Sequence, residues 1–369
     1  MSTPLCPYFN KCGGCSAQHI DYSLQLENKK KLVQRITKTD NIKVFSDQPY
    51  SYRNRMDFVF FPGGLGLRQQ GTKFQIINIE QCTISEPPLN TLLTQIRQFF
   101  QHIDAFNQTK QQGTYHYAVI RITSTGDSTI SFLLNEDSPQ LPNAIEKIKQ
   151  FANQTTAKNI IIAVLPKNID NSTSEDIITI KGNDYLTETL CNKQFRYSSQ
   201  GFFQNNTKMA EQMQHYVHTL LQSYPTQHAH LLDLYAGVGT FGIINSSVFK
   251  SVSIVESYPA SIELAETNLQ LNNITNAKTH ILDAKHLHKL TFPTPLYIIL
   301  DPPRIGMDQK TIHTLNTLKP ELIIYISCNP EQLAKDLLKF SNYQLKSAAL
   351  FDLFPQTNHA EVIVELVKK

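Results

Sequence analysis

Two short apolar runs near the carboxyl end of the chain each finish in polar residues flanked by proline. Residues 296–300 lead into Asp301-Pro302-Pro303-Arg304, and residues 322–326 lead into Ser327-Cys328-Asn329-Pro330. Each run is too short for a helix and has the composition of a buried strand. Ligands of open parallel sheets bind at the carboxyl ends of the strands, so we expect Asp301 and Cys328 in one crevice. A carboxylate and a thiol there predict nucleophilic chemistry, although a cysteine after a strand is often only a small buried hydrophobic residue.

The amino terminus holds three closely spaced cysteines with two glycines between the last pair: Cys6, Cys12 and Cys15. This spacing favours a metal or cluster site, and a closed site needs a fourth ligand. Cys82, in a turn-like stretch, is the best candidate, because Cys191 lies beside a predicted strand and Cys328 belongs to the crevice. Free surface thiols are the alternative, and the spacing does not separate zinc from iron–sulfur.

Length and composition limit the class of protein. A chain of 369 residues with 41% hydrophobic residues is expected to form two or three domains. It has no apolar stretch of bilayer-spanning length and no apolar signal core at its amino terminus, which predicts a cytoplasmic protein that does not bind membranes. The net charge is only +3, but residues 1–80 carry 11 Lys and Arg against six Asp and Glu. This basic region favours a phosphate-bearing partner.

The first half of the chain predicts a mixed α+β domain. A helix is expected over residues 21–37, with Leu24, Leu32, Val33 and Ile36 on one side. Arg53 and Arg55 lie two apart on a predicted strand, and Arg68 follows a glycine turn; these arginines suit phosphate contacts, with simple solvent-facing alternation as the alternative. Further helices are expected over residues 89–105 and 140–153, and strands over residues 74–79, 117–123, 129–134, 160–165 and 176–180.

From residue 231 onward, strands alternate with helices as in a doubly wound α/β fold. A helix over residues 207–221 precedes them. Seven strands are predicted, and the short connection before the last one makes the final pair antiparallel. They cover residues 231–234, 251–255, 278–282, 296–300, 322–326, 345–350 and 362–367.

A glycine loop follows the first of these strands. Gly237-x-Gly239-x-x-Gly242 matches the dinucleotide fingerprint, and Glu256 lies 19 residues after Gly237, near the position of the ribose-binding acid. The loop therefore predicts an adenosine-bearing cofactor, with close backbone approach at Gly237. Hydride transfer to NAD needs no thiol, whereas Asp283, at the end of the third strand, could contact an adenine amino group. These features favour S-adenosylmethionine.

With these residues identified, the chain resembles the RNA uracil-5-methyltransferase family over nearly its whole length. The matching stretches fall in the family's order: CPYFNKCGGC, Cys82, YRNR, FFQNN, DLYAGVGTFG, Glu256, Asp283, DPPR, SCNP and HAE at residues 359–361.

The resemblance implies cofactors and residue roles. It implies a 4Fe–4S cluster on Cys6, Cys12, Cys15 and Cys82. It implies S-adenosylmethionine against Gln204, Tyr235, Thr240, Glu256, Asp283 and Asp301. Cys328 becomes the nucleophile that adds to carbon 6 of uracil, and Glu361 becomes the base that removes the carbon 5 proton. Arg304 would hold a phosphate, and RNA is the expected partner of Arg53, Arg55 and Arg68 as well.

The expected architecture combines these parts: a cluster segment (1–18), a helix that packs on the catalytic domain (19–48), an α+β RNA-binding domain (49–195) and a Rossmann-like methyltransferase domain with a seven-stranded sheet (196–369). Only five residues precede Cys6, whereas many relatives begin with a small β-barrel, so the layout is most similar to the family's 23S rRNA enzymes. A uracil-54 tRNA enzyme and a 5-methylcytosine RNA enzyme are the alternatives, and a monomer is expected. An amino-group methyltransferase would usually carry an aromatic residue at position 304, and a non-enzymatic RNA-binding protein would not bind the cofactor.

Overall fold

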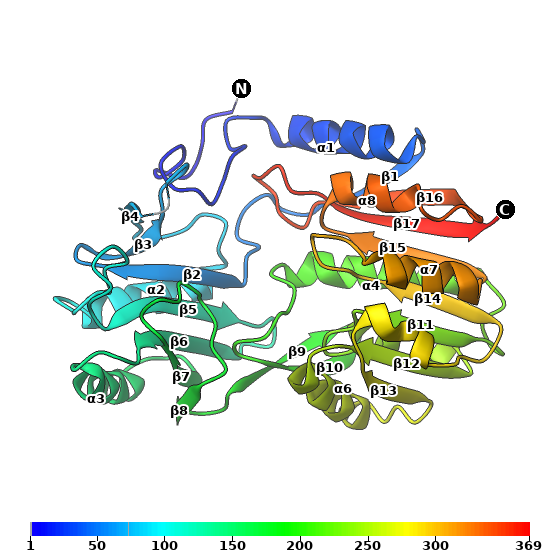
Figure 1. Cartoon of the computed structure of the whole chain (residues 1–369). Helices are drawn as coiled ribbons and strands as arrows, with labels where there is room; N and C mark the ends of the chain where they lie inside the picture. The colour runs from blue at the N-terminus through cyan, green and yellow to red at the C-terminus, as the bar shows by residue number, and fades with distance from the viewer. Residues whose placement is uncertain (1, 73) are drawn as a thin grey trace. The chain divides into compact units, whose positions relative to one another are not determined.

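The computed structural model describes residues 2–72 and 74–369, and these form two compact units (Figure 1). The first unit contains the chain up to Tyr22, Gln48–Glu188 and Tyr197–Thr207; the second contains Ser23–Asp47, Thr189–Arg196 and Lys208–Lys369. The expected cluster segment, whose residue 1 lies outside the described residues, is part of the first unit. The catalytic domain was expected over residues 196–369. In the structure the second unit also contains Ser23–Asp47 and Thr189–Arg196, and Tyr197–Thr207 belongs to the first unit. Of the helices in the described part of the chain, none is long and apolar enough to cross a bilayer.

The first unit is built on a seven-stranded sheet in the order β4-β3-β2-β5-β6-β7-β8. Its neighbouring strands are antiparallel except β6 and β7, which run parallel and are connected through α3. The bounds are β2 (Arg55–Phe61), β3 (Gly64–Arg68), β4 (Ile76–Asn78), β5 (Tyr115–Ile122), β6 (Ser128–Asn135), β7 (Asn159–Leu165), β8 (Ile177–Lys181), α2 (Pro87–Phe99) and α3 (Leu141–Ala152).

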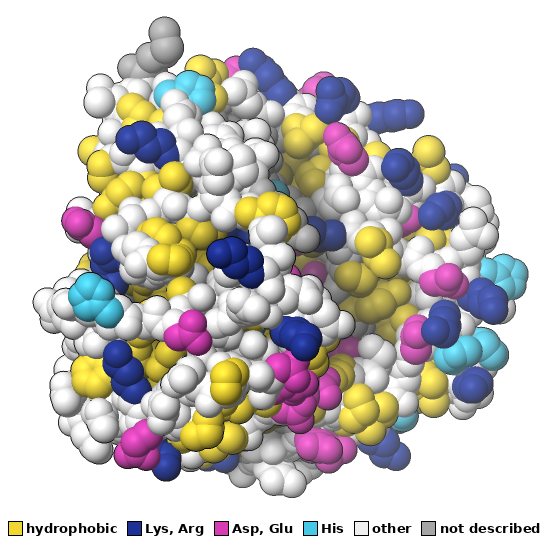
Figure 2. Space-filling view, turned by 60° about the vertical axis from the view of Figure 1, so that its left-hand side comes forward, with side chains coloured by type: hydrophobic (Ala, Val, Ile, Leu, Met, Phe, Trp, Pro, Cys, Tyr) yellow, Lys and Arg dark blue, Asp and Glu magenta, His cyan; other side chains and the backbone are white. Residues whose placement is uncertain are grey.

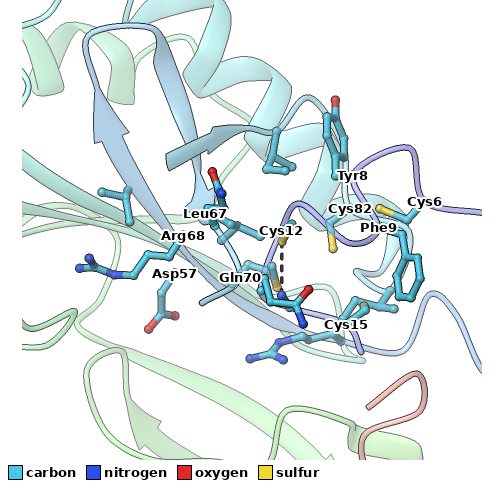
Figure 3. A pocket seen from close by; sticks show the side chains of 18 of the residues that line it. Cys6, Tyr8, Phe9, Cys12, Cys15, Asp57, Leu67, Arg68, Gln70 and Cys82 are labelled. Carbon is cyan, nitrogen blue, oxygen red and sulfur yellow. Dashed lines mark hydrogen bonds between the residues drawn. The ribbon is translucent and has the colours of Figure 1, made fainter. Parts of the chain in front are cut away.

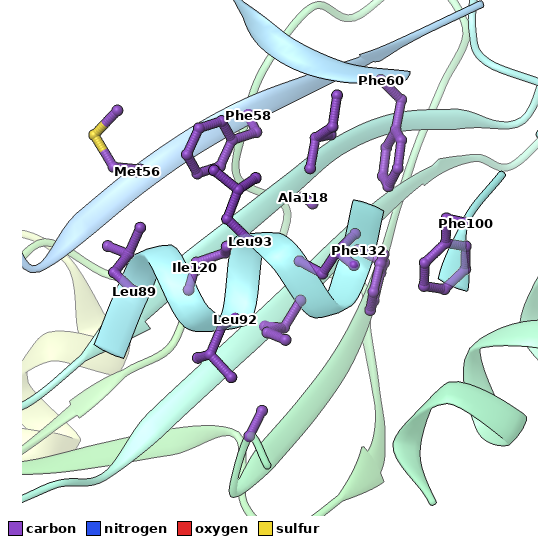
Figure 4. Packing of buried hydrophobic residues seen from close by; sticks show 14 of the residues in the cluster. Met56, Phe58, Phe60, Leu89, Leu92, Leu93, Phe100, Ala118, Ile120 and Phe132 are labelled. Atoms are coloured by element: carbon purple, nitrogen blue, oxygen red, sulfur yellow. The ribbon is translucent and has the colours of Figure 1, made fainter. Parts of the chain in front are cut away.

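Helix α2 covers the core of this unit. Its buried residues follow the spacing of one helix face and meet the apolar side of β2 and β5 (Figure 4): Leu89, Leu92, Leu93 and Ile96. The expected continuation of this helix to residue 105 is wrong. The helix ends at Phe99, His102 takes a left-handed φ of 50°, and Ala105 pairs with Tyr115 of β5. The segment after α2 is extended because it pairs with β5, and for this reason the helix does not continue to residue 105.

The second unit contains the Rossmann-like α/β fold, with an eight-stranded sheet in the order β1-β16-β17-β15-β14-β11-β12-β13. The final strand β17 runs antiparallel between β15 and β16, as the short connection predicted. The bounds are α1 (Tyr22–Thr37), β1 (Ile42–Phe45), α4 (Thr207–Gln222), β11 (His230–Leu234), α5 (Thr240–Asn245), η1 (Ser246–Val248), β12 (Ser251–Glu256), α6 (Pro259–Leu271), β13 (Ala277–Ile281), η2 (Ala284–Lys289), β14 (Leu296–Leu300), α7 (Gln309–Leu318), β15 (Leu322–Ser327), α8 (Pro330–Leu337), β16 (Tyr343–Phe351) and β17 (Glu361–Lys368). A hairpin of β9 (Tyr185–Leu190) and β10 (Lys193–Ser198) forms a separate two-stranded sheet.

The expected count of seven strands was one too low, because the short strand β1 extends the sheet. It pairs in parallel with β16, with Ile42 opposite Ala348. Local sequence barely indicates this strand, since it has four residues and only Ile42 is buried. Its neighbour in the sequence, α1, packs on the same unit.

Helix α1 buries only part of the expected apolar side: Val33 lies in the core, but the polar residues Gln25 and Lys29 are buried with it. Leu24 is 45% exposed, whereas Lys29 is 5% exposed. The Lys29 Nζ lies 2.6 Å from a carboxylate oxygen of Asp352 and donates to the Phe354 carbonyl, and the Gln25 and Gln356 side chains hydrogen-bond to each other. A buried charge is tolerated only when it is paired in this way. The buried pair thus fixes α1 to the segment before β17.

Candidate active site

The parallel strands of the second unit end together at one edge of its sheet. Leu234 of β11 lies opposite Leu300 of β14, which in turn lies opposite Tyr325 of β15. The residues that follow these strands therefore begin at the same edge. This register brings the Asp301 and Cys328 tails together, as expected for the carboxyl ends of a doubly wound sheet.

The turn after β15 presents the Cys328 side chain. The Asn329 backbone N–H donates to Ser327 Oγ, and the Asn329 side chain caps α8 by accepting from the Gln332 backbone N–H. Cys328, between Ser327 and Asn329 in the chain, is half-buried. Burial and the carboxyls of Glu361 and Asp301 raise the pKa of the Cys328 thiol to about 11, while the Arg304 guanidinium opposes the shift. The thiol therefore needs a nearby cation or base to react at neutral pH.

Glu361 faces this thiol because β17 is antiparallel to β15. Ser327 lies opposite Val362, so the next positions along the two strands, Cys328 and Glu361, are adjacent. The Glu361 side chain is only 3% exposed. Burial, and secondly the charge of Asp301, raise its pKa well above the ordinary value, with Arg304 acting in the opposite direction. A buried carboxyl with a raised pKa beside a thiol suits proton transfer.

The Asp301-to-Arg304 tail is tied to the cysteine turn. The Asn329 side-chain amide donates to the Arg304 carbonyl at 2.9 Å. Arg304 itself is exposed, and burial raises the pKa of Asp301 to about 7. A shift of the Arg304 loop would therefore move the Cys328 turn with it.

Asp336, which the sequence analysis missed, holds the residues that follow Arg304. Its buried carboxylate accepts hydrogen bonds from Tyr325 Oη and from the Met307 backbone N–H. Gly306 has a φ of 79°, and an added Cβ there would lie 2.6 Å from the Asp336 carboxylate. The sequence contained one indication of this role. Asp336 lies three residues after Leu333, so helical spacing puts its carboxylate on the buried face of α8.

The glycine loop after β11 has the form of an adenosine site. Gly239 adopts a left-handed φ of 84° at the start of α5, and the Gly237 backbone N–H donates to the Glu256 carboxylate at 3.1 Å. An added Cβ on Gly237 would meet no atom within 4 Å in the part of the chain that the structure describes, so there is open space beside the loop. At Gly242 a Cβ would lie 2.9 Å from Ile254 and 3.0 Å from the Asp233 carboxylate. The first glycine can therefore admit a ligand, and the last permits close helix–sheet packing.

Asp233, a buried acid, lies beside this loop. Asp233 is 1% exposed; burial, together with the charges of Asp301 and Glu256, raises its pKa to about 7, although the Gly242 backbone N–H opposes the shift. One of its carboxylate oxygens is buried and has no hydrogen-bond partner among the described residues. A cationic sulfonium fits such an acid-rich edge better than an anionic group would.

The other residues assigned to the cofactor lie on different elements. Tyr235 has a left-handed φ of 64° just after β11, and Thr240 is the first residue of α5. Asp283 caps η2 and forms a 2.7 Å ion pair with Lys285. Gln204 belongs to the first unit, where its carbonyl accepts from the Asn54 side chain.

The four cysteines proposed for the amino-terminal site line one cavity of about 660 Å³ in the first unit (Figure 3). Cys6, Cys12 and Cys15 are half-buried, and Cys82 is buried. The strand pairing of Cys12 with Gln69 holds the amino-terminal segment, and the Asn90 side chain accepts from the Cys82 backbone N–H.

Burial dominates the chemistry of these thiols. It raises the pKa of Cys12 to about 11 and that of Cys15 to about 12, and the other cysteines of the group add to both shifts. Four clustered thiols would not ionise together without a cation among them. The donor set therefore fits a metal ion or a metal–sulfur cluster.

Of the predicted phosphate-binding arginines in the first unit, Arg55 and Arg68 pair with acids, whereas the Arg53 guanidinium donates to the Arg55 carbonyl. Arg55 forms a two-point ion pair with Asp57, at 2.8 and 3.0 Å. Arg68 pairs likewise with Asp170 and donates to Tyr117 Oη. The sequence analysis did not find these acidic partners. On the face drawn in Figure 2, basic side chains are interspersed with acidic and hydrophobic ones.

Comparison with known proteins gives a consistent result. The family model described as tRNA (Uracil-5-)-methyltransferase matches residues 21–369. The chain is 30% identical over 367 residues to the tRNA (uracil(54)-C(5))-methyltransferase of Pyrococcus abyssi, with 99% of this chain and 86% of that protein covered. It is 30% identical over 380 residues to an uncharacterized RNA methyltransferase of Bacillus cereus, with 97% and 82% covered. The crystal structure of the P. abyssi tRNA (uracil-54, C5)-methyltransferase with S-adenosyl-L-homocysteine superimposes with a TM-score of 0.82 at 28% identity, with 96% and 86% covered.

Proposed function

The chain belongs to the tRNA (uracil-5-)-methyltransferase family, a family of S-adenosylmethionine-dependent RNA-modifying enzymes, and we propose that it methylates carbon 5 of uracil through a transient bond between Cys328 and the base. The observation that carries the proposal is the position of Cys328 and Glu361. Cys328 directly follows β15, next to Glu361 at the start of β17, at the edge of the sheet where the glycine loop also begins.

The proposed reaction begins at carbon 6 of the uracil ring. The Cys328 thiolate adds there, and the electron pair of the carbon 5–carbon 6 double bond moves to carbon 5 as an enolate. S-adenosylmethionine supplies the methyl group that carbon 5 accepts. Glu361 then takes the proton from carbon 5, the double bond re-forms, and the sulfur–carbon bond breaks to return the thiolate.

This chain's own residues would position the reactants. Asp301, at the end of β14, would orient the base or the positively charged cofactor, and Arg304 would both favour the thiolate and contact a phosphate. Gly237, Glu256, Tyr235, Thr240, Asp283 and Gln204 are proposed as further cofactor contacts. The target base must leave its stack to reach Cys328, which suits an RNA loop better than a duplex.

We propose a 4Fe–4S cluster for the cysteine cavity of the first unit. Four thiols line one cavity of about 660 Å³, and four cysteine thiolates are the usual ligands of a four-iron cluster. Four thiolates also suit a tetrahedral zinc site, so metal analysis of the purified protein distinguishes the two.

Replacing Cys82 with Ser is expected to remove the cluster. Cys82 is the ligand that ties the amino-terminal cysteines to the segment before α2, and a hydroxyl is a poor substitute for a thiolate. Iron content of anaerobically purified protein should fall from about four atoms per chain to near zero. Cys191→Ser, which removes a cysteine outside this cavity, is the matched control and should keep its iron. Equal iron in the two variants would contradict the cluster assignment.

For the RNA substrate, we propose tRNA first and 23S rRNA second. The named P. abyssi relative is a tRNA (uracil(54)-C(5))-methyltransferase, and 23S rRNA is the substrate that the sequence analysis favoured. Residues 49–195 are proposed to bind the RNA. Phe202, with a side chain 72% exposed, offers an aromatic face on which an unstacked base could lie.

The substrate is tested with unmodified tRNA and 23S rRNA transcripts and methyl-labelled S-adenosylmethionine. We expect 5-methyluridine in digests of the tRNA, at a rate at least about tenfold above that for the rRNA, because base and loop contacts discriminate between RNAs. The reverse ratio would assign the enzyme to rRNA. Label in 5-methylcytosine would reject the uracil assignment.

A further inference from the structure

A second group of metal-ligand side chains lies in the second unit, apart from the cysteine cavity. Cys191 is at the turn of the β9–β10 hairpin, whose tip, Thr189–Arg196, belongs to this unit. Glu211 and His215 lie four residues apart on α4, so they share one face of the helix. The hairpin turn rests against this face, because the Cys191 backbone N–H donates to a Glu211 carboxylate oxygen at 2.7 Å.

The three ligand atoms already have the spacing of a metal site. The Cys191 sulfur, a Glu211 carboxylate oxygen and a ring nitrogen of His215 all lie within 4.8 Å of one another. The sulfur lies 3.6 Å from His215 Nε2. In a tetrahedral zinc site, bonds of about 2.3 Å to sulfur and about 2.05 Å to nitrogen place these two atoms about 3.5 Å apart. This pair therefore needs almost no movement to bind one ion.

The hydrogen bond from Cys191 also orients the carboxylate. It occupies one Glu211 oxygen, and the second oxygen is left for an ion. A ligating carboxylate that is held by a hydrogen bond on its other oxygen is typical of metal sites. Cys191 and Glu211 are half-buried, and His215 is exposed, so an ion can enter from solvent.

We propose that Cys191, Glu211 and His215 bind one zinc-type divalent cation, with water or an external ligand at the fourth position. The set of one thiolate, one imidazole and one carboxylate suits zinc and does not suit the hard cations magnesium and calcium. The ion would fasten the hairpin tip to α4. This inference does not depend on the methyltransferase chemistry or on the iron–sulfur cluster.

The backbone at the hairpin tip is left-handed, and a bound ion would stabilise this conformation. Cys191 and Asn192 have φ values of 49° and 60°. Asparagine is common in this conformation, whereas cysteine is not. A bound ion would offset the conformational cost at Cys191 by holding its side chain.

The test is zinc binding by the full-length protein with its iron retained. After equilibration with micromolar free zinc and removal of unbound metal, elemental analysis should give one zinc per chain in the wild type. His215→Ala, which changes an exposed side chain, and Cys191→Ser should each lower the affinity about a hundredfold or more and leave the iron content unchanged. His228→Ala, at another exposed histidine of the same unit, is the matched control and should keep the zinc.

Cobalt gives a readout of the ligands themselves. Cobalt(II) in place of zinc should produce a thiolate-to-metal charge-transfer band that disappears in Cys191→Ser and persists in Cys82→Ser. Zinc retained equally by the wild type, Cys191→Ser and His215→Ala would overturn the proposal. A wild type that binds no zinc under these conditions would overturn it as well.

Discussion

Cys328→Ala is expected to abolish methylation, with a fall in kcat of at least about 10⁴-fold. Carbon 5 of uracil is too weak a nucleophile to take a methyl group without prior addition at carbon 6, and removal of the thiol removes that addition. The measurement is transfer of labelled methyl groups to RNA, together with a search for protein–RNA adducts on denaturing gels. The variant should bind S-adenosylmethionine as the wild type does, because the glycine loop is untouched. Turnover at a wild-type rate would reject the covalent mechanism.

The pH dependence of this thiol gives an independent check. Burial and two neighbouring carboxyls raise the pKa of Cys328 to about 11, so the reactive thiolate is a minor form at neutral pH. Its fraction grows with pH below that value, and alkylation of Cys328 should accelerate by about tenfold per pH unit between pH 7 and 10. Arg304→Gln removes the cation that favours the thiolate, so alkylation at a fixed pH should be slower in that variant. A rate independent of pH would show that the thiol is already ionised.

Glu361→Gln is expected to trap the covalent RNA adduct. Glutamine has nearly the same shape, so addition of Cys328 and methylation can still occur, but an amide cannot accept the carbon 5 proton. Turnover should fall by about 10³-fold while an adduct that survives denaturation accumulates on labelled RNA. Cys328→Ala/Glu361→Gln should form none, which identifies the sulfur as the attachment point. Normal turnover without adduct would remove Glu361 from the role of base.

The protonation state of Glu361 determines whether the methylation rate rises or falls with pH. Its pKa lies well above the ordinary value in the free protein, chiefly because it is buried, and the base must be ionised to accept a proton. Both Cys328 and Glu361 must therefore lose a proton before turnover. The methylation rate is expected to rise with pH through the neutral range.

Much of the second unit was predictable from local sequence. The runs that end in Asp301 and Cys328 are short, apolar and followed by proline, and such strands are specified by their own composition. The alternation of strands and helices likewise predicted the parallel order that brings these residues to one edge. The glycine loop and Glu256 followed from a local motif, and their hydrogen bond was a consequence of two adjacent strands.

Two of the less accurate predictions, those for α1 and Arg68, share a physical cause. Helix α1 was expected to bury Leu24 and Val33 on one side; Val33 is buried, but Leu24 is exposed, and the buried Lys29 pairs instead with the distant Asp352. Arg55 and Arg68 were assigned to phosphate, yet Asp57 and Asp170 lie close enough to pair with them. Folding brings Asp352 to Lys29 and Asp170 to Arg68, so no local pattern reveals these two partners, whereas Asp57 follows Arg55 by two residues and lies on the same strand face.

By itself, the sequence determined which residues can do chemistry, because a thiol, a carboxylate or a glycine turn is a property of the residue and its neighbours. Only the tertiary structure decided which of them act together. Glu361 faces Cys328 because β17 inserts antiparallel between β15 and β16, and Cys191 meets Glu211 and His215 because a hairpin turn rests on α4. Strand order and element packing depend on burial of the whole apolar surface, and this is a property of the entire chain.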